Sequence, residues 1–263
     1  MGPLVLSEKL DLLREVLRPI SLQDKRVLDA GTGRTSARAL LEKEPSEIVL
    51  VAAPGDERKA KPAREALAQF PNTKGNVILG DLSNSGLSPP DSFDFALADY
   101  LIGEIDCFAP SMQFPILANI YNWLRPGGEL LIVDIEPPAV NKVGVLSLMQ
   151  EFVFWAQMTS VLARRWKDRP RDYKAELVST WLKGIGFADI RTDYYERRLD
   201  VEYADGIHKM AVERLSGLRN ESIREGLRHQ LDAALSAIRD LPASRWINMT
   251  QTNYSIRAVK RDG

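Results

Sequence analysis

The segment KRVLDAGTGRTSARALLEK, residues 25–43, constrains the fold more than any other part of this chain. An apolar run ends on Asp29, a turn with Gly31 and Gly33 follows, and a helical pattern begins soon after. Such a strand–turn–helix unit directs backbone N–H groups and a helix N-terminus toward a crevice at the sheet edge. Glycine in the turn lets a ligand approach the backbone closely. The segment predicts an α/β fold with a nucleoside-type ligand here, although Ser36 makes the match to a dinucleotide fingerprint imperfect.

Strand and helix patterns alternate along most of the chain, which predicts a parallel sheet with helices on both faces. Strands are expected at 26–29, 46–52, 76–79, 93–98, 129–135, 188–199 and 245–260. Helices are expected at 6–18, 35–43, 56–70, 111–124 and 172–187, with two more within 206–241. Residues 141–166 break this rhythm, because they are apolar around most of a helical circumference. A helix of that kind is buried or covers something apolar.

Composition and charge narrow the class of protein. The 263 residues, 44% hydrophobic and 27% charged, are expected to form a single domain, 1–263. A net charge of −1 argues against a dedicated nucleic-acid binder. The single cysteine, Cys107, excludes an intrachain disulfide, and no metal site is expected. The N-terminus does not resemble a secretory signal, and no apolar run is long enough to span a bilayer, so we expect a cytoplasmic location.

Three ordered motifs carry a resemblance to a known family. VLDAGTG at 27–33, GDL at 80–82 and LRPGGELLIVD at 124–134 together resemble the Rossmann-like S-adenosylmethionine-dependent methyltransferases, over residues 20–140. The resemblance implies a doubly wound, mostly parallel, seven-stranded sheet with a helical cap. It also implies S-adenosylmethionine as cofactor, with S-adenosylhomocysteine as product, and a small-molecule acceptor. Residues 141–180 and 205–241 would be helical insertions that form the cap or a substrate lid. A homodimer is compatible with the sequence.

The resemblance also implies which residues bind the cofactor. Asp29 would orient its methionyl end, and Asp99, at the end of the fourth strand, would hold its ammonium group. Asp81 would accept a hydrogen bond from the adenine amino group, with Leu82 beside the ring. The turn residues that complete the expected cofactor site are Gly31, Thr32, Gly33 and Gly80.

The second strand departs from the family pattern. Many members place an acid at its end to hold the ribose, but this chain has Ala52, Ala53 and Pro54 there. Asp56 or Glu57, just beyond, could take that role. Either acid could equally serve the first turn of the next helix, where the macrodipole favours negative charge.

Candidates for catalysis and acceptor binding are fewer. Tyr100 and Glu104 are the expected catalytic residues, because they follow the fourth strand, where ligands bind in open α/β sheets. We expect Glu104 and Asp106 to lie on a loop. Acids on loops are commonly only solvated. Within the apolar segment, the expected lid residues are Met149, Phe152 and Trp155.

Other functions remain open at this stage. A protein or nucleic-acid methyltransferase would use the same core, and a nicotinamide-dependent oxidoreductase shares the fold. A non-catalytic binding or scaffold protein is kept open by the acid missing after the second strand. Methyl transfer to a small molecule requires mainly alignment and water exclusion, so the lack of an obvious catalytic dyad does not oppose it.

Overall fold

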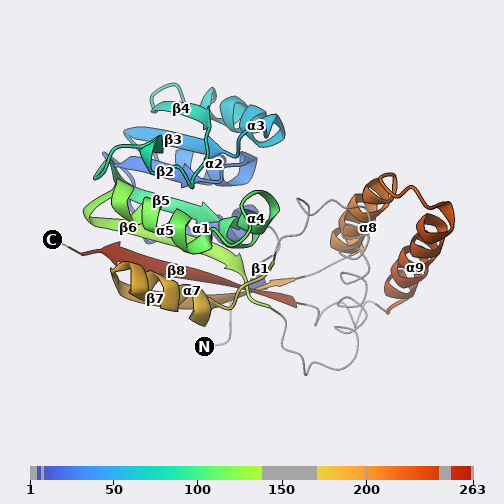
Figure 1. Cartoon of the computed structure of the whole chain (residues 1–263). Coiled ribbons are helices and arrows are strands. Elements are labelled where there is room, and N and C mark those ends of the chain that lie inside the picture. Colours follow the sequence, from blue (N-terminus) through green and yellow to red (C-terminus); the bar gives the residue numbers. More distant parts are fainter. Residues whose placement is uncertain (1–4, 7–8, 138–170, 199–200, 243–249, 262–263) are drawn as a thin grey trace.

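Eight strands form one sheet in the computed structural model, which describes residues 5–6, 9–137, 171–198, 201–242 and 250–261 (Figure 1). The order across the sheet is β1-β7-β8-β6-β5-β2-β3-β4. The strands are β1 (Val5–Leu6), β2 (Arg26–Ala30), β3 (Glu47–Ala52), β4 (Lys74–Leu79), β5 (Phe93–Asp99), β6 (Leu124–Ile135), β7 (Phe187–Arg198) and β8 (Thr250–Lys260).

The seven long strands confirm the predicted sheet. Neighbouring strands from β4 to β6 run parallel, and β8 lies antiparallel between β6 and β7. The two-residue strand β1, which pairs parallel to β7, was not predicted. Because β2, β3, β4, β5 and β6 run in one direction, their carboxyl ends meet at one edge of the sheet.

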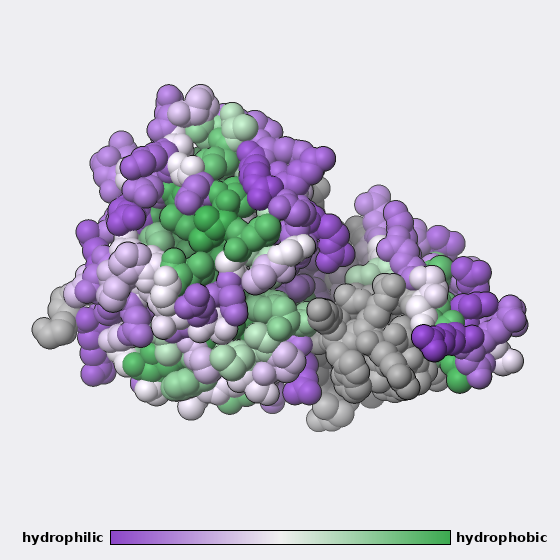
Figure 2. Space-filling view, turned by 45° about the horizontal axis from the view of Figure 1, so that its top comes forward, coloured by the Kyte–Doolittle hydropathy of each residue, from purple (hydrophilic) through white to green (hydrophobic). Residues whose placement is uncertain are grey.

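Helices cover both faces. Buried residues of α1 (Lys9–Leu17), α2 (Arg34–Leu41) and α3 (Glu57–Leu67) share one hydrophobic core with one face of the sheet. Those of α4 (Leu101–Phe108), α5 (Gln113–Trp123) and α7 (Ala175–Ile185) share a second core with the other face. The connection from β4 to β5 contains only a short 3-10 helix, η1 (Ser85–Leu87). Figure 2 shows an apolar area in the upper part of the view.

Helix α4 corrects one expectation. Glu104 and Asp106 were expected on a loop, but both lie in α4. Leu101, Ile102 and Ile105 are buried, so the helix is held by the apolar side that it turns to the core. Its N-cap, Tyr100, has a left-handed backbone, and its side chain accepts no capping hydrogen bond, which explains why no start signal is visible in the sequence.

A helical hairpin lies beside the sheet. Helices α8 (Val201–Leu215) and α9 (Glu221–Arg239) pack on each other around a hydrophobic core of their own, to the right of the sheet in Figure 1. This confirms two helices within 206–241, with the first beginning earlier than predicted. The Asn220 side chain caps α9 by accepting from the Ile223 N–H at 3.1 Å.

The predicted lid, 141–180, is described only from residue 171 onward. Residues 175–180 belong to α7, where Ala175 and Val178 are buried in the sheet core. Met149, Phe152 and Trp155 lie outside the described residues. No helix in the described ranges combines the length and apolar character needed to cross a membrane.

Candidate functional site

The turn after β2 is fixed to the end of β3. The N–H groups of Gly31 and Thr32 both donate to the Val51 carbonyl, at 3.0 and 2.8 Å. Gly31 has φ +86°, and a Cβ there would lie 2.9 Å from Leu101 Cδ1. Glycine is therefore required at position 31 by backbone conformation and by packing. These two N–H groups were expected to be directed toward a crevice. They instead donate hydrogen bonds within the protein.

Asp29 organises the inside of this turn. Its carboxylate is fully buried, and Oδ2 accepts hydrogen bonds from Thr32 Oγ1 at 2.5 Å and from Ser36 Oγ at 2.8 Å. Ser36 Oγ also accepts from the Gly33 N–H at 3.0 Å. The serine that departs from the dinucleotide fingerprint thus joins the strand end to the start of α2.

Gly33 differs from Gly31. Its backbone is extended, with φ −147°, and a Cβ at this position would meet no atom within 4 Å. Neither conformation nor packing within the protein calls for glycine here. Gly33 instead leaves bare the N-terminus of α2, where a helix favours polar and anionic groups. This open cradle fits the close approach of a cofactor to the backbone.

The turn after β4 holds the next predicted group. Gly80 donates its N–H to the Ala52 carbonyl at 2.9 Å, and a Cβ there would lie 2.7 Å from Leu87 Cδ1. Asp81 is exposed, and its Oδ1 accepts from the Ser83 backbone N–H and hydroxyl, at 2.9 and 2.7 Å. Leu82 is buried in the core that α4 and α5 share with the sheet.

Asp56 and Glu57 differ in their side-chain contacts. Asp56 is the N-cap residue of α3, yet its side chain makes no capping hydrogen bond, and its Oδ1 lies 3.4 Å from Arg58 Nε. Glu57 forms an ion pair with Arg64 at 2.7 Å. Asp56 is thus the better placed of the two for a ligand that lies at the end of β3.

Asp99 ends β5, and Tyr100 follows it. Asp99 is buried, and Tyr100 has a left-handed φ of 51° that is uncommon for a non-glycine residue. Tyr100 donates its N–H to the Val133 carbonyl at 2.7 Å and its hydroxyl to Asn253 Oδ1 at 2.7 Å. Burial, and then the charge of Asp99, raise the pKa of Tyr100. The phenol therefore stays protonated, and it can orient a group but is a poor proton acceptor.

Glu104 and Asp106 each have a partner on another element. Glu104 Oε2 lies 3.3 Å from Lys59 Nζ, so the pair links α4 to α3 across the carboxyl edge of the sheet. Asp106 accepts from Gln113 Nε2 at 2.9 Å and from Tyr173 Oη at 2.7 Å, which gives it a structural role.

Residues 171–174 form a strap that crosses α4. Gly103 is needed beneath it, because a Cβ there would clash with the Arg171 carbonyl. Tyr173 holds the strap to Asp106, and the Ala175 N–H that follows donates to Glu136 Oε2 at 2.9 Å. Glu136 and Ala175 lie on either side of residues 138–170. The chain therefore leaves and re-enters the described structure beside the carboxyl edge.

Sequence reasoning missed Asp134, next to last in β6. It is 3% exposed, and it accepts from the Ile135 N–H at 2.8 Å and from the Gly103 N–H at 3.4 Å. Burial raises its pKa to about 7, and the charges of Asp172 and Asp99 act in the same direction. Like Asp29 and Asp99, Asp134 is an acid at the end of an apolar strand, and that signal was available in the sequence.

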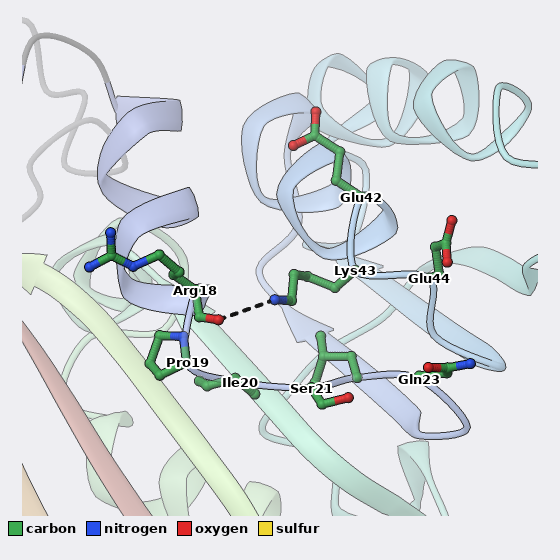
Figure 3. A pocket seen from close by; sticks show the side chains of 9 residues that line it. Arg18, Pro19, Ile20, Ser21, Gln23, Glu42, Lys43 and Glu44 are labelled. Carbon is green, nitrogen blue, oxygen red and sulfur yellow. Dashed lines mark hydrogen bonds between the residues drawn. The ribbon is translucent and has the colours of Figure 1, made fainter.

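A shallow pocket of about 350 Å³ lies elsewhere (Figure 3). Its lining residues come from 18–23, before β2, and from 42–44, after α2. Lys43 Nζ donates to the Arg18 carbonyl across it at 3.5 Å. The pocket therefore belongs to the amino edge of the sheet, opposite the candidate site.

Comparison with known proteins supports the fold. Neither a scan against protein-family models nor a search of curated protein sequences finds a match. Among solved structures, an S-adenosylmethionine-dependent methyltransferase from Archaeoglobus fulgidus is similar, with a TM-score of 0.56 and 17% identity, over 96% of this chain and 95% of that one. Phosphoethanolamine N-methyltransferase 2 of Haemonchus contortus, in complex with S-adenosylmethionine, gives a TM-score of 0.55 at 17% identity, over 96% of this chain and 53% of that one. The cyclase SpnF gives a TM-score of 0.55 at 16% identity, over 96% and 82% of the two chains. The chain thus has the Rossmann-like methyltransferase fold.

Proposed function

We propose that this protein binds S-adenosylmethionine at the carboxyl edge of β2, β3, β4 and β5 and transfers its methyl group to a small-molecule acceptor. The observation that carries the proposal is Gly33, because it leaves the N-terminus of α2 open beside Asp29 at the carboxyl edge, where a ligand can approach the backbone. When bound, S-adenosylmethionine would supply an electrophilic methyl group, so the protein needs mainly to align the reactants and exclude water.

Each residue then has a stated role. Asp29, with Thr32 and Ser36, fixes the turn beneath the cofactor, and Gly33 leaves room for it. Asp99 would hold the ammonium group. Asp29, Gly33 and Asp99 lie at the carboxyl ends of β2 and β5, which are neighbours in the sheet. Central position and burial both protect such a site from water.

The outer part of the cofactor would lie across β3 and β4. We infer that Asp56 holds the ribose, because its carboxylate caps no helix although it lies at an N-cap position. Asp81 would receive the adenine amino group, since its Oδ1 alone is used by the Ser83 turn. We infer that Tyr100 orients the acceptor through its hydroxyl. Glu104, which is paired with Lys59, is not assigned a role in catalysis.

The strap and the helical hairpin would form the acceptor side. The strap enters beside Gly103, close to the ends of β5 and β6. Met149, Phe152 and Trp155 remain predicted lid residues. They belong to the part of the chain between Glu136 and Ala175, and these two residues are hydrogen-bonded to each other. Together these parts would exclude water from the reacting groups.

Calorimetric titration with S-adenosylmethionine tests the proposal. Gly33→Val places a side chain in open space, so the fold should persist while cofactor affinity falls by more than about tenfold. Gly226→Ala in α9 is the matched control, since a Cβ there also meets no atom within 4 Å. Absence of binding to the unmodified protein at millimolar cofactor would refute the proposal.

A non-catalytic binding protein of the same fold is the second candidate. It is favoured by the end of β3, where Ala52 and Ala53 stand in place of an acid. Cofactor binding with no methyl transfer to any acceptor, measured with isotope-labelled cofactor in a cell extract, would favour this candidate over the enzyme.

A further inference from the structure

Tyr254 and Asp134 face each other on one side of the sheet. They are directly paired between β8 and β6, and Tyr194 of β7 pairs with Tyr254 from the other side. Paired residues in antiparallel strands share a face. Tyr254 is 0% exposed, and its hydroxyl has no hydrogen-bond partner among the residues that the structure describes. A buried hydroxyl without a partner is costly, so the position calls for a group that is not supplied by these residues.

The surroundings of this hydroxyl are acidic. Burial, and then the charges of Asp134, Glu136 and Asp172, raise the pKa of Tyr254. Glu196, on the same face of β7, accepts from Thr252 Oγ1 at 3.0 Å through Oε1, while its Oε2 is buried with no partner in the described structure. Carboxylates gathered around a buried hydroxyl favour a positively charged ligand.

The described cations nearby are directed elsewhere. Arg197 pairs with Gln251 in the next register position, so it lies on the opposite face of the sheet. Arg171, in the strap, is mostly exposed and lies 3.8 Å from Asp106. A metal ion does not suit the carboxylates, because no three acidic, histidine or cysteine side chains in the described ranges are placed to hold one. An ammonium group needs only three hydrogen-bond acceptors, and a hydroxyl can be one of them.

We propose that Tyr254, with the carboxylates of Asp134, Glu136 and Glu196, receives the nitrogen of a small protonated amine, and that the acceptor is therefore an amine. This inference rests on the proposed methyl transfer. The ammonium group would donate to Tyr254 Oη and to Glu196 Oε2, the two atoms here without a partner in the described structure, and its third N–H would reach Asp134, while Glu136 would act through its charge. Asp172 is exposed and acts electrostatically on both Asp134 and Tyr254, which marks the side that faces solvent.

Asp134 suits the proton chemistry that an amine requires. A protonated amine has no free electron pair and must lose a proton before it can act as a nucleophile. Its N–H bond would break and an O–H bond would form on Asp134, which leaves the neutral amine with its electron pair. Burial holds the pKa of Asp134 at about 7, so this carboxylate can accept a proton near neutral pH.

The test is saturation-transfer NMR on the full chain in the presence of S-adenosylhomocysteine. The probes are n-butylammonium, with n-butanol and butyrate as neutral and anionic matches. We expect n-butylammonium to bind in preference to both. Tyr254→Phe and Glu196→Gln should each weaken that binding about tenfold, as expected for lost hydrogen bonds to a charged group. Tyr194→Phe is the control, because Tyr194 lies on the same face but is exposed.

Tyr254→Phe should fold at least as well as the unmodified protein, since it removes only an unpartnered hydroxyl. Equal binding of n-butanol, no binding of n-butylammonium, or unchanged binding in both variants would overturn the inference. Calorimetry with S-adenosylhomocysteine separates the two proposals. Loss of cofactor binding would refute the proposed function, whereas normal cofactor binding without amine preference would refute only the amine site.

Discussion

Ser36 Oγ donates to Asp29 Oδ2 at 2.8 Å and accepts from the Gly33 N–H at 3.0 Å. One hydroxyl therefore joins the carboxyl end of β2, the turn and the first turn of α2. In a dinucleotide fingerprint this place holds glycine or alanine, which only packs helix against strand. Here the contact is polar and buried, so the turn depends on a hydrogen-bond network and not on packing alone.

Removing this hydroxyl should destabilise the turn. We expect Ser36→Ala to lower the free energy of unfolding by about 1.5–3 kcal/mol, since it deletes a hydrogen bond to a buried carboxylate. Urea unfolding measures this change. Ser179→Ala, on α7, is the control, because Ser179 meets Thr192 only at 3.5 Å. Equal stability losses in the two variants would contradict a special role for the Ser36 network.

Asp134 should make stability depend on pH in an unusual direction. Burial raises its pKa from 3.8 to about 7 in the folded protein. Between these values the folded state binds more protons than the unfolded state, so the contribution of Asp134 to stability falls as pH rises from about 4 to about 7. The total change is at most about 4 kcal/mol.

Asp134→Asn removes this titration and keeps an acceptor for the Ile135 N–H. We expect the free energy of unfolding of the variant, relative to that of the unmodified protein, to be higher at pH 8 than at pH 5. Urea unfolding of both proteins at the two pH values gives the difference. A stability difference that is the same at both would show that Asp134 does not titrate in this range.

The strap should depend on Tyr173. Its hydroxyl donates to Asp106 Oδ2 at 2.7 Å, and Gln113 completes the contact. We expect Tyr173→Phe to speed hydrogen exchange of the amides at 171–175 by about tenfold, because a bond to a carboxylate is worth about 1.5–3 kcal/mol. Tyr194→Phe should leave this exchange unchanged. Slow exchange in Tyr173→Phe would mean that Gly103 and Glu136 hold the strap without it.

The central fold could be predicted from the sequence because strand and helix periods, with Gly31 and Gly186 at their ends, are local signals. Gly186 has φ +119° and ends α7 as a left-handed cap. Helix α4 could not be predicted, since it has no capping side chain and its N-cap residue Tyr100 adopts a backbone that depends on tertiary contacts. Asp134 followed the same rule as Asp29 and was overlooked.

The candidate site was predictable in its positions but not in its contacts. The residues on the turns after β2 and β4 lie at the carboxyl edge, as topology requires. The sequence could not reveal that Asp29 is turned toward Thr32 and Ser36, or that Glu104 pairs with Lys59. The acidic group around Tyr254 depends on pairing between β6, β7 and β8, which are far apart in the chain.

The last prediction concerns the ribose. Asp56 is an N-cap residue without a capping bond, whereas Glu57 is paired with Arg64. If Asp56 holds the ribose, Asp56→Asn should weaken S-adenosylhomocysteine binding by about ten- to a hundredfold, which corresponds to about 1.5–3 kcal/mol. Asparagine caps helices as well as aspartate does, so the stability of α3 should not change. Glu57→Gln is the matched control, because it removes a charge from the first turn of the same helix. Calorimetry measures all three affinities: equal values would show that Asp56 does not hold the ribose, and a loss confined to Asp56→Asn would assign Asp56 to the cofactor.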